Sequence, residues 1–398
     1  MRLLIPLFSP ATGTWGGLTR GIAVAEAARD AGHAVAFCAS GYLQGVLADR
    51  GYRVFSIPSA TMLGLPPSLS RIIEKRAPRA TPPVRPGKSI GSVWLVLVFS
   101  GFARGKYLRD LVRTEIRAVN DFRADRIFTD LDPGAFLAAA VTGVPLASAY
   151  ASISTHGSGT PAWRYLHRAW EKILRSYGRP ARNPDQLYFG EGILKVIPSI
   201  PELDGTDPDR NDVCYVGHLL GPIQSTTDFR LEGKRRCMFV YVGTGSVSLG
   251  TLENVLPRHF PAGAETCCIV GSQGVKRPYR VGAVEFYPYV PAEGILSYCD
   301  WTICHGGQNT IIQSLLHGVP LIVFPGAIFE RRFNARLVEE NGAGFMGELS
   351  QFNEPWLETA FSRREDCAGR AARLAERLRF YGGAAAAVRA ISSWEKEI

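Results

Sequence analysis

The sequence lacks any apolar run that approaches the roughly 18–20 residues needed to cross a bilayer, which excludes an integral membrane protein. Its first apolar segment, residues 3–8, is too short for the apolar part of a signal peptide. It also runs into a glycine-rich turn instead of a cleavage site with small residues. We therefore expect residues 3–8 to form a buried strand and the protein to be cytoplasmic.

Two familiar site patterns are also missing. The eight cysteines include no Cys-x-x-Cys pair, so the sequence indicates neither a zinc site nor a disulfide framework. Each half of the chain has a glycine-rich loop after its first strand, and neither loop has the Gly-x-Gly-x-x-Gly pattern of dinucleotide-binding dehydrogenases. We therefore expect no metal and no bound cofactor.

What is present is a globular composition, because 46% of the 398 residues are hydrophobic and 20% are charged. This length favours two domains. The net charge of +9 is concentrated in residues 71–117, where eleven lysines and arginines stand against three acidic residues. This segment is either a solvated basic face or a contact for an anionic acceptor or a peripheral membrane surface. It carries no nucleic-acid-binding motif, so we expect no nucleic-acid partner.

Short apolar runs alternate with helix-period segments in both halves of the chain, which predicts α/β domains with parallel sheets. In each half a strand runs into a glycine-rich loop and a helix, at residues 3–31 and again at 237–260. Each half also has a helix that ends at the sequence Gly-Val-Pro-Leu, at residues 143–146 and 318–321, where glycine caps the helix and proline prevents its continuation. The expected fold class is therefore α/β, with two facing Rossmann-like doubly wound domains and a cleft between them.

Composition places the boundary between these domains in a segment rich in proline, glycine and aspartate. We expect an N-terminal domain at residues 1–210, a linker at 211–234 and a C-terminal domain at 235–379. A last helix within residues 380–398 is expected to return to the first domain.

The strongest local pattern is a strand that ends at His305 and is followed by Gly306, Gly307 and a helix. Two glycines let the main chain approach a ligand closely, and the free amides at a helix N-terminus attract anions. The loop at residues 243–246 offers further amides at another strand-to-helix turn. Two such turns at the carboxyl ends of parallel strands predict a cleft for a nucleoside diphosphate.

Residues 237–344 resemble the donor domain of nucleotide-sugar glycosyltransferases with the GT-B fold, most closely the inverting enzymes that glycosylate natural products with UDP- or TDP-sugars. The resemblance rests on the order of several short motifs: Tyr289-Val290-Pro291, the turn at His305, Gly318-Val319-Pro320, Asn334-Ala335 and Gly342-Ala343-Gly344. It implies metal-independent, inverting transfer of a sugar from a nucleotide diphosphate sugar to a small-molecule acceptor. The C-terminal domain would bind the donor and the N-terminal domain the acceptor.

The resemblance also implies which residues hold the donor. Tyr289 would stack on the base, and the main chain of Val290 would bond to it. The remaining donor residues would hold the diphosphate, the ribose and the sugar: Gly243, Thr244, Gly245, Ser246, His305, Gly307, Gln308, Asn309, Thr310, Gln313, Glu330 and Arg331.

Some of these positions depart from the family pattern. Gln313 stands where the family has a ribose-binding glutamate, so its neutral carbonyl would make a weaker contact. Glu330 and Arg331 replace the Asp-Gln pair that grips sugar hydroxyls, and the arginine adds a fixed positive charge. That charge either selects an unusual or anionic sugar or pairs with a nearby glutamate.

The N-terminal loop lacks the family's histidine base, because Gly17 stands at that position, after Trp15 and Gly16 on the acceptor side. The aspartate that partners this histidine corresponds to Asp130. We expect Asp130 or Asp132 to be the base, although a carboxylate of ordinary pKa is a weak base near pH 7. Three alternatives stay open: a structural cap at Asp130, a loop movement that brings in His156, and an acceptor that needs no strong base.

The pair Asp130 and Asp132 also matches the metal-binding Asp-x-Asp of another glycosyltransferase fold, but that fold does not explain the turn at His305. Two other functions stay open, and the missing histidine motivates the first of them. One is a catalytically silent nucleotide-binding subunit that supports a partner enzyme. The other is an epimerase or hydrolase of nucleotide sugars on the same fold.

Overall fold

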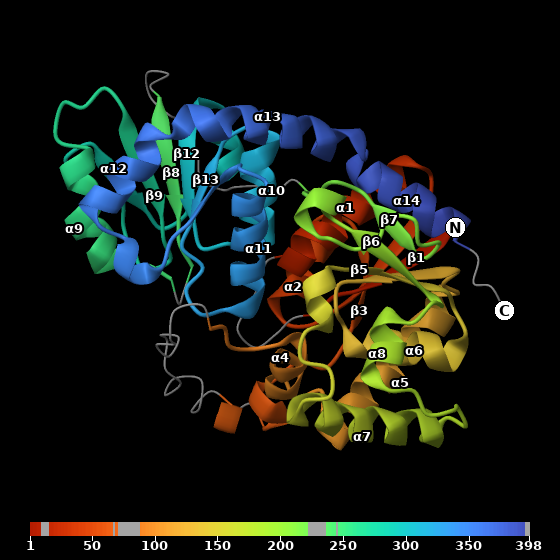
Figure 1. The fold of residues 1–398 in the computed structure, drawn as a ribbon. Coiled ribbons are helices and arrows are strands. Elements are labelled where there is room, and N and C mark those ends of the chain that lie inside the picture. Colours follow the sequence, from red (N-terminus) through yellow and green to blue (C-terminus); the bar gives the residue numbers. More distant parts are fainter. Residues whose placement is uncertain (9–15, 67, 71–87, 222–235, 244–245, 395–398) are drawn as a thin grey trace.

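The computed structural model describes residues 1–8, 16–66, 68–70, 88–221, 236–243 and 246–394. Within these residues the chain forms two sheets of seven strands, and each sheet has helices on both faces (Figure 1). The prediction of two doubly wound α/β domains is confirmed.

The first sheet has the strand order β3-β2-β1-β4-β5-β6-β7, and each of its pairings is parallel. Alternate residues of its central strand enter two cores, since Leu4 packs on one face and Leu3 and Ile5 on the other. The winding reverses between β1 and β4, so the loops after these two strands flank a crevice. The strands are β1 (Arg2–Pro6), β2 (Ala34–Ala39), β3 (Arg53–Ser56), β4 (Arg126–Thr129), β5 (Leu146–Ala149), β6 (Ile193–Ile197) and β7 (Val213–Tyr215).

Local sequence sets the ends of the helices that cover this sheet. In α6, for example, Asp132 is the N-cap, Pro133 follows at the first helical position, and Gly143 ends the helix in the left-handed conformation. The described helices of this domain are α1 (Gly16–Asp30), α2 (Tyr42–Ala48), α4 (Val93–Phe99), α5 (Gly105–Phe122), α6 (Pro133–Thr142), α7 (Pro161–Ser176) and α8 (Pro184–Phe189), with short turns η1 (Met62–Gly64), η2 (Ser152–Thr155) and η3 (Pro201–Leu203).

The second sheet has the order β10-β11-β9-β8-β12-β13-β14 and is parallel except for the β10–β11 pair. Its winding reverses between β8 and β12, which places the loops after these strands at a second crevice. Its strands are β8 (Cys237–Tyr241), β9 (Cys267–Gly271), β10 (Tyr279–Val281), β11 (Val284–Tyr287), β12 (Cys299–Cys304), β13 (Leu321–Val323) and β14 (Gly344–Met346). The helices and turns are α9 (Leu249–His259), η5 (Ala292–Gly294), η6 (Leu296–Tyr298), α10 (Gln308–Leu316), α11 (Phe329–Glu340), η7 (Leu349–Gln351), α12 (Glu354–Ser362) and α13 (Arg364–Phe380).

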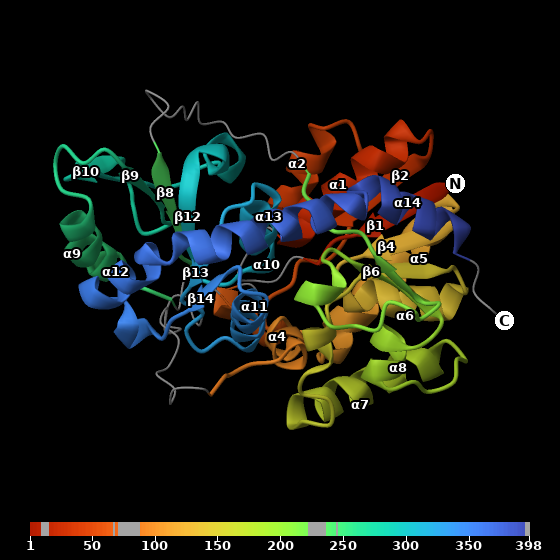
Figure 2. The same ribbon diagram turned by 45° about the horizontal axis from the view of Figure 1, so that its top comes forward.

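The chain crosses between the domains twice. The first sheet extends past residue 210, where we placed the end of the first domain, because β7 pairs with β6. The return crossing is made by α13, which bends at Gly382 into α14 (Gly383–Ser393) (Figure 2). Helix α14 packs against α1, and its Ala387, Val388 and Ile391 enter the core of the first domain.

The two domains also touch across the cleft. Main-chain hydrogen bonds join Ile90 to Ala327 and Phe329, which makes a parallel bridge between the segment before α4 and the segment before α11. The ring of His156 stacks on Phe329 with centroids 5.5 Å apart. These contacts join the two domains on either side of α4 and α11.

The apolar segment at residues 92–105 forms α4 near this contact. Val93, Trp94 and Leu97 are buried in the first core, while Leu95, Val96 and Phe99 are exposed. In the described part of the chain, no helix combines the length and the apolar character needed to cross a membrane.

The packing of α14 gives a test of the return crossing. Ile391 is 1% exposed. We expect Ile391→Ala to lower the free energy of unfolding by about 2–4 kcal/mol, because it removes buried methyl groups and leaves a cavity. Urea unfolding followed by circular dichroism measures this difference. The control is Phe380→Ala at the end of α13, where the ring is 79% exposed and the expected change is within about 0.5 kcal/mol. Equal effects of the two substitutions would contradict the packing.

Candidate active site

The first half of the site lies at the start of α1. Gly16 and Gly17 open this helix, and Arg20 follows one turn later. The Arg20 guanidinium donates two hydrogen bonds to Oδ2 of Asp130, from Nε at 3.0 Å and from Nη2 at 2.7 Å. Asp130 stands directly after β4, so the first crevice contains an arginine–aspartate ion pair.

The absence of a side chain at residue 17 leaves room for this ion pair. A Cβ atom at residue 17 would lie 2.9 Å from Asp130 Oδ2, which is closer than real contacts allow. A Cβ atom at residue 16 would lie 3.2 Å from Arg20 Nη2. The position where the family has its histidine is therefore occupied by the Asp130 carboxylate and the Arg20 guanidinium.

Asp132 has a different environment. Its side chain is buried and accepts a hydrogen bond of 2.8 Å from the main-chain N–H of Gly134, which caps α6. Burial raises its pKa to about 6, although the main-chain hydrogen bonds act in the opposite direction. Because its carboxylate faces helix α6 instead of the cleft, the structure does not bring Asp132 to the place where an acceptor could give it a proton.

Behind Asp132 lies a second buried carboxyl group that the sequence analysis missed. Glu115 of α5 is fully buried, and neither of its oxygens has a hydrogen-bond donor among the described residues. Burial, and then the charge and hydrogen bonding of Asp132, raise the pKa of Glu115 well above its ordinary value. Burial without a hydrogen-bond donor therefore favours the protonated form of the Glu115 carboxyl.

The second half of the site is the turn after β12. His305 Nδ1 lies 3.4 Å from the carbonyl oxygen of Tyr241, at the end of β8. Gly243 and Gly307 lie against the imidazole ring, because a Cβ atom would stand 3.4 Å and 2.9 Å, respectively, from His305 Nε2. The loops after β8 and β12 thus meet at the histidine, as the sequence predicts.

The imidazole of His305 is neutral at physiological pH. Burial, and then the nearby Arg331 guanidinium, lower the pKa of His305 to about 4, while the contact with the Tyr241 carbonyl acts in the opposite direction. As a neutral ring, His305 can donate one hydrogen bond to an anion but adds no charge.

Helix α10 begins directly after this turn. Its N-cap is Gly307, which has no side-chain capping bond, and its first residues are Gln308, Asn309 and Thr310. The helix therefore directs main-chain N–H groups toward the cleft. Asn309 Oδ1 accepts a hydrogen bond of 3.1 Å from Nη1 of Arg20, so the guanidinium of the first domain reaches this helix end.

The other predicted donor residues surround this turn at different depths. Ser246 donates a hydrogen bond of 2.6 Å to the carbonyl of Phe324, after β13. The Tyr289 ring is exposed, as a base-stacking surface requires, and Val290 is buried against the sheet. Gln313 lies half-buried in the second turn of α10.

Glu330 and Arg331 open α11, but they face different neighbours. Glu330 is accessible to solvent and lies in the electrostatic range of Arg20 and Asp130. Desolvation by the protein around it raises its pKa, and the two arginines Arg20 and Arg331 oppose this rise. Arg331 lies half-buried in the electrostatic range of both His305 and Tyr241. It therefore adds positive charge beneath the turn at His305.

On the acceptor side, the structure describes Gly16, Gly17 and His156. The stacking of His156 on Phe329 makes it a residue of the interdomain contact. Trp15, Thr244 and Gly245 lie outside the described residues, as does most of the basic stretch before residue 88.

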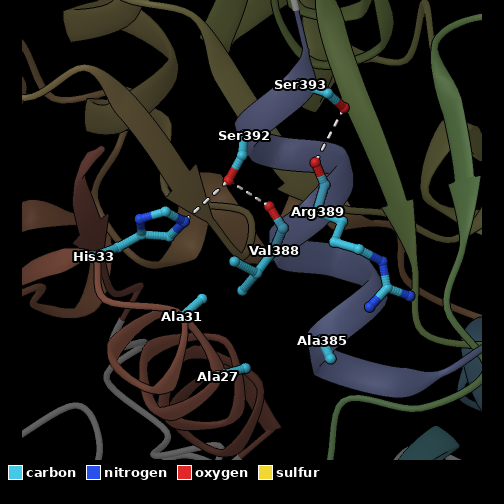
Figure 3. Close-up of a pocket in the computed structure, with 8 residues that line it drawn as sticks. All are labelled: Ala27, Ala31, His33, Ala385, Val388, Arg389, Ser392 and Ser393. Atoms are coloured by element: carbon cyan, nitrogen blue, oxygen red, sulfur yellow. Dashed lines mark hydrogen bonds between the residues drawn. The ribbon is translucent and has the colours of Figure 1, made fainter.

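No group of three or more His, Cys, Asp or Glu side chains is placed to hold a metal ion in the part of the chain that the structure describes. A depression of about 490 Å³ lies between α1 and α14, where His33 Nε2 is 3.4 Å from Ser392 Oγ (Figure 3). It is at the far end of α1 from Gly16 and Arg20, so it is separate from the cleft residues.

Known proteins resemble both the sequence and the fold. Residues 277–379 match the family model of the erythromycin biosynthesis protein CIII-like C-terminal domain. The aclacinomycin-T 2-deoxy-L-fucose transferase of Streptomyces galilaeus is 37% identical over 71 residues, which are 18% of this chain and 16% of that protein. The chain spans less than half the length of the first curated relatives it matches.

Solved structures match over nearly the whole chain. The glycotransferase of kitacinnamycin has a TM-score of 0.73 and 17% identity, covering 98% of this chain and 97% of that one. The chain has the GT-B fold. A second GT-B structure, the spinosyn rhamnosyltransferase SpnG complexed with thymidine diphosphate, has a TM-score of 0.66 and 18% identity and covers 99% of this chain and 100% of that one. The predicted resemblance to the natural-product glycosyltransferases is confirmed by these matches.

The buried carboxyl pair gives a test that does not depend on activity. We expect Glu115→Gln to raise the free energy of unfolding relative to the natural protein, by an amount that grows as the pH rises from about 5 to about 8. The unfolded chain releases the Glu115 proton near the ordinary pKa of 4.5, whereas the native protein retains it to a higher pH, so the natural protein loses stability across this interval. Glutamine removes that loss.

Urea unfolding at several pH values measures the difference. Glu376→Gln on the exposed face of α13 is the matched control, with no pH-dependent change expected. A difference between Glu115→Gln and the natural protein that stays constant with pH would show that Glu115 is not the group responsible.

Proposed function

We propose that this chain transfers a sugar from a UDP- or TDP-sugar to a small-molecule acceptor, with inversion at the anomeric carbon and without a metal ion. The observation that carries the proposal is the meeting of two strand-to-helix turns, each at the reversal point of its sheet. In doubly wound sheets this is where ligands bind. The relatives are sugar transferases by name, and SpnG holds thymidine diphosphate.

The donor would lie on the second domain. Its base would stack on the exposed ring of Tyr289, and its diphosphate would accept hydrogen bonds from the N-terminus of α10 and from the neutral His305. Glu330 is the one carboxylate among the predicted donor residues, and it lies in the electrostatic range of Arg20 of the first domain, so it would accept hydrogen bonds from the sugar hydroxyls.

The acceptor would approach from the first domain. The exposed Leu95, Val96 and Phe99 of α4 provide an apolar surface beside the interdomain bridge at Ile90, which suits an acceptor with an apolar skeleton. Lys88 and Arg104 flank this helix and belong to the predicted basic segment, so an anionic acceptor group or membrane surface would be attracted to the same side.

In the reaction, an acceptor oxygen forms a bond to the anomeric carbon while the bond from that carbon to the donor phosphate oxygen breaks. The electron pair of the broken bond goes to the diphosphate, and the acceptor loses its proton. Asp130 is the proposed base, because both hydrogen bonds from Arg20 end on Oδ2 and Oδ1 is the oxygen that would take the proton. The positive end of α10 stabilises the departing charge.

One observation favours a second function. Residue 17 is glycine and Asp130 is already bound by Arg20, so the first domain has lost the histidine that activates acceptors in the resembled family. Such a chain could bind nucleotide and act as a silent subunit beside an active transferase. Release of UDP or TDP from the sugar donor separates the possibilities. Acceptor-dependent release supports transfer, release without acceptor indicates a hydrolase, and binding without release indicates a silent subunit.

Replacement of the proposed base tests the mechanism. We expect Asp130→Asn to reduce turnover by about a hundredfold or more, because asparagine can still accept a hydrogen bond from Arg20 but cannot take a proton. The affinity for UDP or TDP, measured by calorimetry, should change by less than about tenfold. Asp132→Asn is the comparison variant, and its turnover should stay near that of the natural protein. Full turnover in Asp130→Asn would show that Asp130 is not the base.

A further inference from the structure

Arg20 is the residue through which the first domain reaches the anion-binding end of the second. Its guanidinium uses Nε and Nη2 on Asp130 and extends Nη1 to Asn309, the second residue of α10. The resemblance assigns no role to this position, and the arginine lies one helical turn beyond the missing histidine. Arg20 is therefore close to the proposed diphosphate although it comes from the acceptor domain.

The surroundings of Arg20 hold its guanidinium in one place. Asp130 fixes it from one side, and the side chains of both partners are largely buried, with 16% of Arg20 and 8% of Asp130 exposed. Gly16 and Gly17 leave the space that the two groups fill. A guanidinium held in this way loses little conformational entropy when it binds an anion. Its planar geometry also fixes the directions of the N–H groups that Asp130 does not use.

The present partner of Nη1 is a neutral one. Asn309 offers an amide oxygen at 3.1 Å, which is a weaker acceptor for a guanidinium than a phosphate oxygen. The main-chain N–H groups that begin α10 are directed at the same place. A phosphate bound there would compete directly with Asn309 for Nη1 of Arg20.

The negative charge of a bound diphosphate would also need positive charge from an arginine. A nucleoside diphosphate brings a multiple negative charge, while the low pKa of His305 leaves its ring neutral at physiological pH. Glu330 adds an acidic group on the second domain, facing Arg20. Positive charge is available from Arg331 beneath the turn and from Arg20 across the cleft.

We propose that Arg20 binds the diphosphate of the donor across the cleft, exchanging Asn309 for a phosphate oxygen while Asp130 keeps hold of its other N–H groups. This inference rests on the proposed function. The consequence is that donor binding joins the two domains through a charged hydrogen bond. When the sugar–phosphate bond breaks and its electron pair moves to the diphosphate, the same guanidinium offsets the charge that develops there.

Binding measurements test the proposal without an acceptor. The probes are UDP and TDP, with uridine and thymidine as ligands that lack the diphosphate, and each dissociation constant is measured by calorimetry. The variants are Arg20→Gln, which removes the charge, and Arg20→Lys, which keeps it. Arg29→Gln is the matched control, since Arg29 lies in the last turn of the same helix and stacks on Tyr52.

We expect Arg20→Gln to weaken binding of the preferred nucleoside diphosphate by about tenfold to a hundredfold and to leave nucleoside binding unchanged. Arg20→Lys should recover part of this loss, and the loss should shrink at high salt because the contact is ionic. Arg29→Gln should bind both kinds of ligand like the natural protein. Unchanged nucleoside binding also shows that the Arg20 variants are folded.

Three results would overturn the proposal, and they have different meanings. If the natural protein binds neither UDP nor TDP, the proposed function fails and the role of Arg20 fails with it. If the natural protein binds a diphosphate and Arg20→Gln binds it equally well, the proposed function stands and only the role of Arg20 is refuted. Equal weakening of nucleoside and diphosphate binding in both Arg20 variants would also refute it, because that pattern indicates a structural role.

Discussion

The close approach of Asp130 to the first turn of α1 determines much of the rest of the cleft. The carboxylate lies 2.9 Å from where a Cβ atom of residue 17 would stand, so a side chain there would require the Asp130 carboxylate to shift. A carboxylate this little exposed needs a charged or hydrogen-bonding partner, and Arg20 supplies it. Because the guanidinium is planar and has five N–H groups, it can bind Asp130 and still reach Asn309 in the second domain. One ion pair thus links the loss of the histidine to the contact between the domains.

Local sequence signals predict much of the fold. The glycine and proline signals at residues 143–146 and 318–321 mark real helix-to-strand transitions, and the last helix expected within residues 380–398 is α14, which returns to the first domain. The end of the first domain was harder, because the three residues of β7 lie in a segment rich in proline and glycine. So short a strand is specified by its pairing with β6, a long-range contact that composition does not record.

The sequence predicts only part of the candidate site. The turn at His305 is local, so its residues meet as the motif predicts. Arg20 was missed because its partners lie 110 and 289 residues away along the chain. Two signals were nevertheless present in the sequence. Asp132 followed by Pro133 is a helix-start pattern, which explains its capping role. Glu115 falls on the apolar face of α5 with Leu108, Leu111 and Val112, which indicates a buried carboxyl group.

Burial affects the charge of the histidine and of the arginines in the cleft differently. The histidine in the second domain is desolvated to the point where it donates a hydrogen bond without charge, and it therefore does not respond to physiological changes in pH. The arginines keep their charge under the same conditions because the guanidinium pKa is so high. In the proposed function, such a site would attract a diphosphate but would give the acceptor little help in losing its proton. Its rate would then depend on how well the domains position the reacting atoms, which makes the contacts at Ile90, His156 and Arg20 as important as the base.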